Sequence, residues 1–337
     1  MIIRRNSIGA EFALMTRGVL LLAALVLAFG WASPATAQTD IDAVRDQLAE
    51  DLQGVHIGAG YAAIVDFAVS RDISSATFYP DEVSGVSDSK LSSIKVPFRF
   101  TLGDDGATTK PFIQGHFAYQ TLNADFEFLA DELVRSEWRT YGGSLSGGLE
   151  IGLSDTMKLI PAVSVGYGRI ENRADYTGPI GNEFLRPVFT NLLFDWDSNA
   201  VVYGASLGID YRRQYDRTEV EVLGNLTHHL VKSTSASTPL ADFDGHVTAF
   251  DLELNAVRPT SLKLGGYPLA VVGLFGYSGI FGPHRDALGF DHFFETGLGL
   301  QGDLSSKGWK LTSLRLGLKA IYGPDVKGWG LIVGYEF

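Results

Sequence analysis

The chain ends in the segment Trp329-Gly-Leu331-Ile-Val333-Gly-Tyr335-Glu-Phe337, and this segment decides the fold. Every odd position holds a large apolar or aromatic residue, and every even position except Ile332 holds Gly or Glu. Successive side chains of a β-strand point to opposite faces, so a period of two places all the bulky groups on one face. The alternation continues to the last residue, where a strand of a soluble sheet is usually frayed. The segment therefore predicts a C-terminal strand with one apolar face.

This pattern resembles the C-terminal strand of Gram-negative outer-membrane β-barrels, whose terminal Phe belongs to the signal read by the barrel-assembly machinery. The resemblance implies that Phe337 is an assembly signal and that the barrel-assembly machinery is a partner. Taken alone, the segment also fits an ordinary edge strand of a soluble sheet, so the rest of the chain has to separate the two interpretations.

The other end of the chain has the features of a secretory signal peptide. Arg4, Arg5 and Arg17 give a positive n-region, and the stretch VLLLAALVLAF within residues 18–30 gives an apolar core. Residues 35–37, Ala-Thr-Ala, offer a cleavage site, so we predict a signal at residues 1–37 with cleavage before Gln38. The apolar core is too short for a membrane-spanning helix. We therefore expect the mature protein to be exported.

Composition agrees with a barrel in a Gram-negative outer membrane. After the signal, no apolar run reaches the roughly 18 to 20 residues that a membrane helix needs. A membrane protein without such helices must be a closed barrel, because lipid offers no hydrogen-bond partner to an open sheet edge. The 39 glycines and the 12% aromatic content suit tight turns and aromatic belts at the membrane interfaces.

Charge and cysteine content narrow the possible partners. The chain has no cysteine, which excludes disulfides and thiolate metal sites. Loss of the signal removes three arginines and Glu11, so the net charge falls from −12 to −14, which argues against nucleic acid as a partner. We expect no cofactor, a monomer, and outer-membrane lipid as the surroundings.

A short helix at residues 38–54 is predicted to precede the barrel. Its apolar residues follow helical spacing after a start at Thr39-x-x-Asp42, and Gly54 is a plausible stop. From residue 55 to 337 we predict an all-β fold, a transmembrane antiparallel up-and-down β-barrel of about twelve strands. The predicted strands are 55–69, 94–102, 111–121, 138–153, 158–173, 200–213, 217–231, 246–258, 267–279, 290–303, 309–322 and 329–337.

Alternation within these strands assigns their faces. In 138–153, Leu145 and Leu149 share one face, and Ser146 and Glu150 share the other. A soluble sandwich also alternates, but its strands average about five or six residues. Membrane strands need about nine to eleven residues, and several of the predicted strands run past a dozen. Strand length therefore favours the barrel.

The connections give a second indication of the topology. Short or moderate turns alternate with long connections, as expected for periplasmic turns, extracellular loops and two periplasmic termini. The short and moderate turns are 103–110, 154–157, 214–216, 259–266 and 305–308, and the predicted long loops are 70–93, 122–137, 174–199, 232–245 and 280–289. The last loop, 323–328, is short where a long one would be usual.

A short helix followed by about twelve strands and a terminal Phe337 resembles the translocator domain of autotransporters without its passenger. The family that this layout resembles is the solitary autotransporter-like outer-membrane barrel. Autotransporters that release a passenger commonly cut the helix at paired Asn residues, and residues 38–54 contain no Asn. Self-cleavage and secretion are therefore not implied.

No catalytic or metal site is predicted. An outer-membrane hydrolase is the enzymatic alternative, but the histidines are scattered, and strand parity places His228 toward lipid and His229 toward the lumen. The pair is interpreted as a belt residue beside a solvated lumenal one. Phospholipase-type and omptin-type barrels would require a Ser or acidic partner converging on such a His.

Charged residues at inward positions are the candidate functional residues. An ion-selective ring is one interpretation. A salt-bridge network that fills a narrow lumen is preferred, because both signs of charge are present and an isolated charge in a tight pore is costly. The residues are Arg99, Arg212, Arg315, Lys319, Glu219, Glu221, Asp251 and Glu253.

The sequence thus predicts a non-enzymatic barrel that acts as a narrow or plugged, porin-like channel or as a structural barrel. The alternative is a surface interaction or adhesion protein acting through loops 70–93 and 174–199. About twelve strands leave a lumen too wide for wall side chains alone to fill, since about eight already suffice for that. We therefore predict that the helix at residues 40–53 folds into the pore as a plug; otherwise it would lie in the periplasm.

Overall fold

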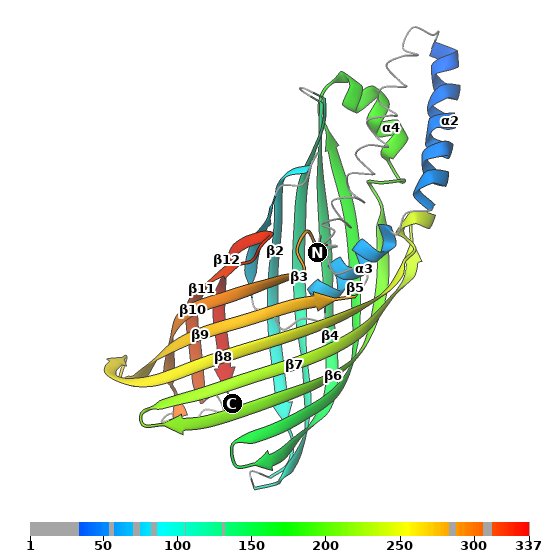
Figure 1. Ribbon diagram of the computed structural model, residues 1–337. Helices are drawn as coiled ribbons and strands as arrows, with labels where there is room; N and C mark the ends of the chain where they lie inside the picture. The colour runs from blue at the N-terminus through cyan, green and yellow to red at the C-terminus, as the bar shows by residue number, and fades with distance from the viewer. Residues whose placement is uncertain are drawn as a thin grey trace, which may run out of the picture.

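The computed structural model describes residues 34–53, 57–69, 75–81, 86–104, 106–129, 132–282, 288–305 and 312–336. It is a closed, antiparallel, twelve-stranded barrel preceded by two helices, which confirms the predicted fold class (Figure 1). The strands are β1 (Ala76–Pro80), β2 (Val86–Thr101), β3 (Thr109–Leu129), β4 (Glu132–Ser154), β5 (Met157–Tyr176), β6 (Asp197–Tyr215), β7 (Thr218–Ala236), β8 (Asp244–Leu264), β9 (Tyr267–Phe281), β10 (His292–Asp303), β11 (Ser313–Tyr322) and β12 (Val326–Glu336).

Each strand pairs with its neighbours in the chain, and β1 pairs with β12 to close the ring. One end of the barrel carries the longest connection, between β5 and β6, with η1 (Gly181–Leu185) and the short helix α4 (Arg186–Phe189). We call this the α4 end. The opposite end carries tight turns such as 155–156 and 216–217, and we call it the turn end. The predicted strands from 138–153 onward each correspond to one of β4 to β12, with bounds that differ by a few residues.

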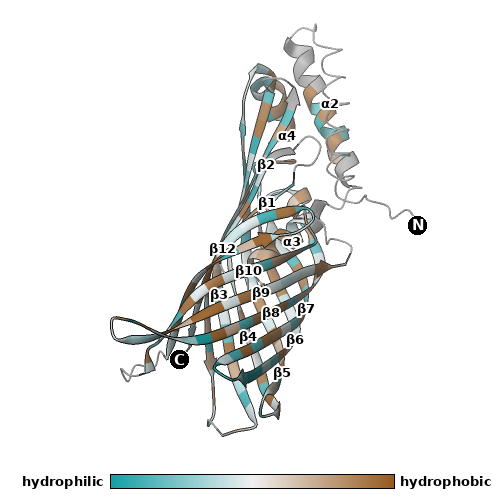
Figure 2. Ribbon diagram, turned by 60° about the vertical axis from the view of Figure 1, so that its left-hand side comes forward, coloured by the Kyte–Doolittle hydropathy of each residue, from teal (hydrophilic) through white to brown (hydrophobic). Residues whose placement is uncertain are grey.

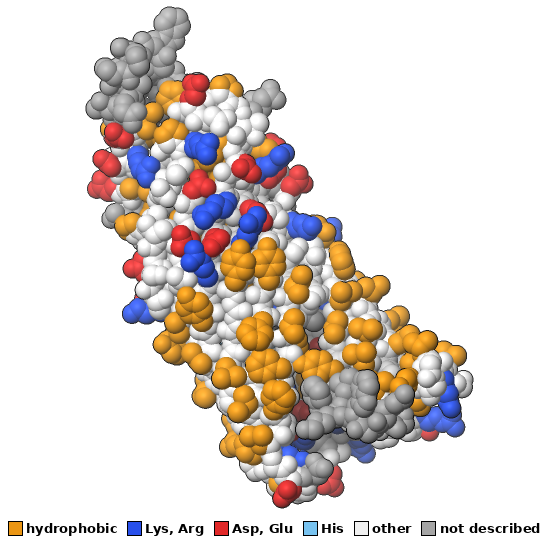
Figure 3. All heavy atoms as spheres, turned by 180° about the vertical axis from the view of Figure 1, so that it is seen from behind, with side chains coloured by type: hydrophobic (Ala, Val, Ile, Leu, Met, Phe, Trp, Pro, Cys, Tyr) orange, Lys and Arg blue, Asp and Glu red, His pale blue; other side chains and the backbone are white. Residues whose placement is uncertain are grey.

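An apolar band surrounds the outside of the barrel. Its side chains include Leu145, Leu149, Leu298 and Leu316, which are between 41% and 70% exposed. Figure 2 shows hydrophobic and hydrophilic residues alternating along the strands, and Figure 3 shows the outward apolar groups gathered below a belt of charge. Exposed apolar side chains in such a continuous band are typical of a surface covered by lipid.

Strands β3 to β6 extend past this band toward the α4 end, and there the polarity of the two faces is exchanged. On β4, the outward positions beyond the band hold charged residues such as Arg135 and Arg139, while Val134 and Trp138 are buried on the inner face. The inner face packs on the β5–β6 connection, in which Phe194 and Trp196 lie in the same apolar cluster. The alternation with a period of two therefore continues beyond the band, but there the apolar side chains face inward and the charged ones face outward.

Two predicted long loops are wrong, and this exchange of faces accounts for the first of them. Residues 122–137 are mostly the ends of β3 and β4, joined only through residues 130–131. The predicted loop 70–93 contains all of β1 and the first half of β2. Strand β1 has only five residues, fewer than the nine to eleven of a full membrane strand, so a search for long alternating segments passes over it.

The predicted first strand, residues 55–69, is also wrong. Residues 57–69 form the helix α3 (Ile57–Val69), and this helix contacts the walls of β3 to β8 from inside the barrel (Figure 1). Every described residue from Tyr61 to Ala68 is buried. A helix that is buried on all sides needs apolar residues on all sides, so its sequence lacks the one-sided pattern that identifies an amphipathic helix.

The predicted helix at 38–54 exists, but it does not lie in the pore. Helix α2 (Pro34–Gln53) packs beside α4, outside the barrel proper (Figure 1). Leu48 is buried in this contact, and Arg45 Nη1 donates to the backbone oxygen of Pro187 at 2.9 Å. The chain therefore approaches the barrel from the α4 end and not from the turn end, where the pattern of turns and loops predicts both termini. The predicted cleavage before Gln38 falls within α2, and residues 1–33 of the predicted signal lie outside the described residues.

Within the described part of the chain, no helix combines the length and the hydrophobicity needed to cross a membrane.

Candidate functional site: a plugged lumen

Helix α3 occupies the lumen toward the α4 end and makes apolar contacts with the wall and the connections. The Tyr61 ring lies 4.3 Å from that of Trp196, measured between centroids. Near the other end of the helix, the Phe67 ring packs edge-on against Phe78 of β1 at 5.5 Å and Phe290 at 6.2 Å. These aromatic contacts hold α3 at Tyr61 and at Phe67, and tilted or edge-to-face packing at such distances is favourable.

Polar side chains from the wall hold the C-terminal half of α3. Lys95 Nζ on β2 donates to the backbone oxygen of Phe67 at 2.8 Å, and Gln120 Nε2 on β3 donates to that of Ile64 at 3.3 Å. The last carbonyls of a helix lack partners within the helix and carry partial negative charge, so a buried ammonium group is a suitable partner there. The wall thus supplies a cap that the α3 sequence does not.

A buried ionisable pair joins α3 to the opposite wall. Asp66 Oδ1 lies 2.8 Å from Nδ1 of His229 on β7, and both side chains are almost completely buried. The His229 ring fits because its neighbour on β6 is Gly204, where a Cβ would collide with the ring and with the Ser164 hydroxyl. His228 is exposed on the outer face and hydrogen bonds to Thr248 Oγ1 at 2.8 Å. The predicted solvated position of His229 is therefore wrong, because α3 covers it.

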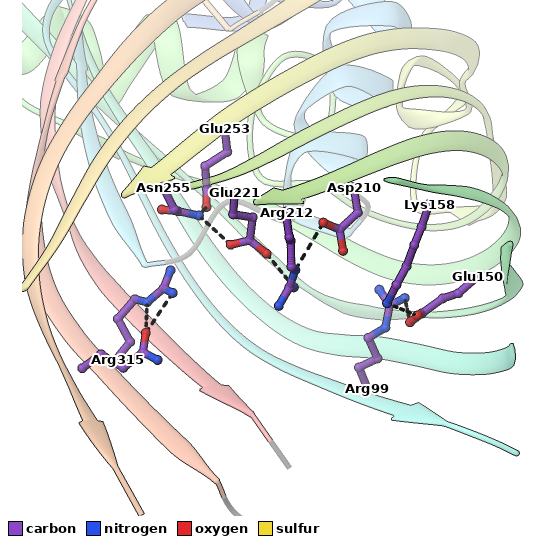
Figure 4. Close-up of polar contacts among 10 residues, drawn as sticks. Arg99, Glu150, Lys158, Asp210, Arg212, Glu221, Glu253, Asn255 and Arg315 are labelled. Atoms are coloured by element: carbon purple, nitrogen blue, oxygen red, sulfur yellow. Dashed lines mark hydrogen bonds and ion pairs between the residues drawn. The ribbon is translucent and has the colours of Figure 1, made fainter. Parts of the chain in front are cut away.

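Toward the turn end the inner wall carries a network of paired charges (Figure 4). Arg99 Nη2 lies 2.7 Å from Glu150, whose other oxygen is 3.0 Å from Lys158 Nζ. On neighbouring strands, Arg212 lies 3.3 Å from Asp210 and 2.5 Å from Glu221. The pairs lie within one strand, between adjacent strands or, for Arg99 and Glu150, across β3, so each cation is held by the nearby wall.

The remaining predicted inward residues belong to the same inner wall. The Asn255 amide donates to Glu221 at 3.2 Å and to Glu253 at 2.6 Å, and Asp251 accepts from Ser278 at 2.7 Å. Arg315 donates twice to Gln301 Oε1, at 3.1 and 2.9 Å. Lys319 Nζ lies 2.7 Å from Glu295 Oε1 in a buried pair. Glu219 is exposed near the β6–β7 turn, and Phe337 lies outside the described residues.

The residues that hold α3 were missed by sequence reasoning because α3 itself was assigned as a strand. Asp66 gave a usable signal, since it is the one charged residue in the apolar segment 57–69. A lone acid in such a segment needs a buried partner. Lys95 gave a weaker signal as a cation between Ile94 and Val96, whose side chains face outward.

The arrangement is suited to obstruction of the lumen. The lumen is filled by an apolar helix at one level and lined by neutralised charge pairs at another. In the described ranges, no group of three His, Asp or Glu side chains could hold a metal ion.

Comparison with known proteins agrees with this architecture. The translocator domain of autotransporter NalP from Neisseria meningitidis is 13% identical, with 87% of this chain and 98% of that chain covered and a TM-score of 0.51. The β domain of the Bordetella autotransporter BrkA is 15% identical, covering 78% and 95%, with a TM-score of 0.49. No curated protein sequence matches the chain.

A family model described as the solitary outer membrane autotransporter beta-barrel domain matches residues 80–337. The match runs from the last residue of β1 through β12 and so covers almost the whole barrel wall. The chain therefore belongs to the solitary outer-membrane autotransporter β-barrel family.

Proposed function

We propose that the protein is a non-enzymatic outer-membrane barrel that plugs its own lumen with α3. The observation that carries this proposal is the burial of residues 61–68 of α3 between opposite walls of the barrel, with Lys95 on one side and His229 on the other. An apolar obstruction in a pore is a strong barrier to hydrated ions. The barrel then acts as a closed channel or as a structural element of the membrane.

The proposal includes the location and orientation of the chain. The apolar outer band would contact lipid, the turn end would face the periplasm, and the α4 end would face the exterior. Export would use the signal predicted at residues 1–37, and insertion would use the barrel-assembly machinery. The extension of β3 to β6 beyond the apolar band, with charged outer faces, supports an aqueous exterior at the α4 end.

Single-channel conductance of the refolded protein in planar bilayers tests the proposal. Replacing residues 57–69 with a Gly-Ser segment of the same length removes α3 and keeps the chain connectivity. The matched control replaces the thirteen residues 41–53 of α2 in the same way. We expect a closed wild type, an open 57–69 variant and a closed control, with heat-modifiable migration in electrophoresis showing that all three barrels are folded. A wild type that conducts as well as the 57–69 variant would contradict the proposal.

A further inference from the structure

The outer wall of the barrel is almost free of charge between the middle of the apolar band and the turn end. Outward side chains on this surface are apolar, aromatic, small or neutral, with two exceptions among the described strand residues, Arg213 on β6 and Arg258 on β8. Both exceptions are exposed cations, and no described outward strand position on this surface holds an acid. The surface therefore carries two positive charges that no outward strand carboxylate balances.

The strand register places the two arginines on either side of β7. Arg213 lies opposite Val220 on β7, and Val220 lies opposite Ala256 on β8, two residues from Arg258. Neighbouring strands are about 4.8 Å apart and residues rise about 3.4 Å along a strand, so the two Cα atoms are about 12 Å apart. Both side chains are long enough to reach the space between them.

The wall between the arginines carries short side chains. These are Val220 and Ala256, and the same row continues on β9 with Gly273. A Cβ added to Gly273 would meet nothing within 4 Å, so no neighbouring side chain covers that end of the row. We call Val220, Ala256 and Gly273, with Arg213 and Arg258 beside them, the arginine patch.

Two tyrosines hold Arg213 on the outer wall. Its Cζ atom lies 5.3 Å from the centroid of the Tyr215 ring, and the hydroxyl oxygens of Tyr215 and Tyr211 are 3.2 Å apart. A guanidinium group over an aromatic face is attracted by the ring and can still donate hydrogen bonds from its edge. Neither arginine of the patch forms an ion pair with a described carboxylate, including those of Asp155 and Asp216 in the adjoining turns. The donors of the patch are therefore available to an anionic ligand.

The opposite rim of the apolar band has a different charge pattern. On the outward faces of β4 and β5, Arg139 lies 2.6 Å from Glu137, and Arg169 lies 2.7 Å from Glu171. Cations there stand beside acids, so an anion that approaches a cation also approaches a negative charge. At the turn end, by contrast, the described outward strand positions around the arginine patch hold no acid.

We propose that the arginine patch binds one phospholipid with two phosphates, of the cardiolipin class, from the leaflet at the turn end. Each guanidinium group holds one phosphate through charge-assisted hydrogen bonds, for which its planar fork is suited. The acyl chains lie along Val222 and Leu254, which continue the patch into the apolar band. Two cations with no acid between them match two phosphodiester charges better than they match a zwitterionic headgroup. The inference rests on the proposed contact of the apolar band with lipid and is independent of the α3 plug.

Native mass spectrometry of the refolded full chain in detergent tests this proposal, with cardiolipin, phosphatidylglycerol or phosphatidylcholine built from the same acyl chains. We expect one cardiolipin to be retained at least about fivefold more tightly than either other lipid, because each arginine near a lipid phosphate contributes about that factor. Arg213→Gln and Arg258→Gln should each lower this retention about fivefold, and the double variant should remove the preference. The matched control is Arg173→Gln, at an exposed outward position of β5 beyond the apolar band, which should bind as the wild type does.

Equal retention of cardiolipin and either other lipid, or equal effects of Arg213→Gln and Arg173→Gln, would overturn the proposal. Heat-modifiable migration in electrophoresis checks that every variant is folded. A cardiolipin with a photoreactive group on one acyl chain locates the bound lipid. It should label β7 and β8 more than β3 and β4, and equal or stronger labelling of β3 and β4 would refute the site. A barrel that inserts into bilayers but shows no lipid preference contradicts this inference alone and leaves the α3 plug unaffected.

Discussion

Asp66 on α3 and His229 on β7 form a buried carboxylate–imidazole contact that joins the plug to the barrel wall, with Oδ1 and Nδ1 separated by 2.8 Å. Neither side chain is more than 5% exposed. A buried pair contributes little net stability compared with a well-packed apolar pair, but loss of one partner leaves the other unpaired at a cost of about 3 to 5 kcal/mol. Docking of α3 therefore depends on both residues being present or both being replaced.

A double-mutant cycle on this pair provides the first prediction. Asp66→Leu alone should raise the open fraction of the pore at least about a hundredfold, since a 3 kcal/mol loss exceeds two factors of ten. Combining it with His229→Leu should restore most of the closed fraction, because two apolar groups replace the pair. Single-channel open probability measures both. Additive effects of the two substitutions would show that the residues do not interact.

Gly204→Ala tests the space that the His229 ring needs. The new methyl group would occupy the position of the ring, so we expect His229 to be displaced and α3 to protect its amides less from hydrogen exchange. The control is Gly273→Ala on β9, where nothing lies within 4 Å of the added Cβ. If both variants keep wild-type protection on α3, the packing role of Gly204 is refuted.

Arginine substitutions test which face of the wall contacts lipid. Leu316→Arg, at a position 55% exposed in the apolar band, should lower the free energy of unfolding in lipid by about 2 to 4 kcal/mol near the midplane. Ser146→Arg points inward and should cost less. Gly317→Arg is an unsuitable inward control, because a Cβ there would collide with the backbone oxygen of Leu298. A larger loss for Ser146→Arg in a denaturant titration would mean that the faces are exchanged.

Deletion of Phe337 tests the assembly signal predicted from the sequence. The deletion should reduce the amount of heat-modifiable protein in the outer membrane severalfold, because a terminal aromatic residue would be missing from recognition by the assembly machinery. Deletion of Gly54 in the interhelix link is the control for loss of one residue elsewhere. An unchanged amount of folded protein without Phe337 would count against the signal.

Sequence reasoning recovered the barrel because the apolar band imposes a long, outward alternation on β4 to β12. It failed where the environment changes along a strand: Leu145 faces outward in the band, but Trp138 on the same strand is buried on the inner face. The period of two does not show which face of a strand contacts water. For this reason residues 122–137, at the ends of β3 and β4, were predicted to be a polar loop. Beyond the band, the inner face is apolar because the β5–β6 connection packs on it. The position of that connection follows from the tertiary fold and is not visible in the local sequence.

The candidate site was only partly predictable. Inward charges such as Arg212 and Glu221 follow from parity, since each lies on a strand with a clear apolar outer face. The plug could not be found in the same way, because α3 is apolar on all sides and a short apolar run is compatible with either a helix or a strand. The pairing of Asp66 with His229 joins residues 163 positions apart and requires the helix to be placed first.

The path of the chain around α3 constrains the order of folding. The pairing of Ala76 with Gly330 joins residues about 250 positions apart, and this pairing closes the ring around a helix that precedes both strands. Contacts of such sequence separation form slowly, because their loop-closure entropy is lost before they are made. With α2 docked on α4 at one end, α3 has to be enclosed before β1 and β12 join. A helix synthesised before every strand is therefore committed to the interior by the last strand to arrive, and ring closure is the step at which a misplaced helix would be trapped outside.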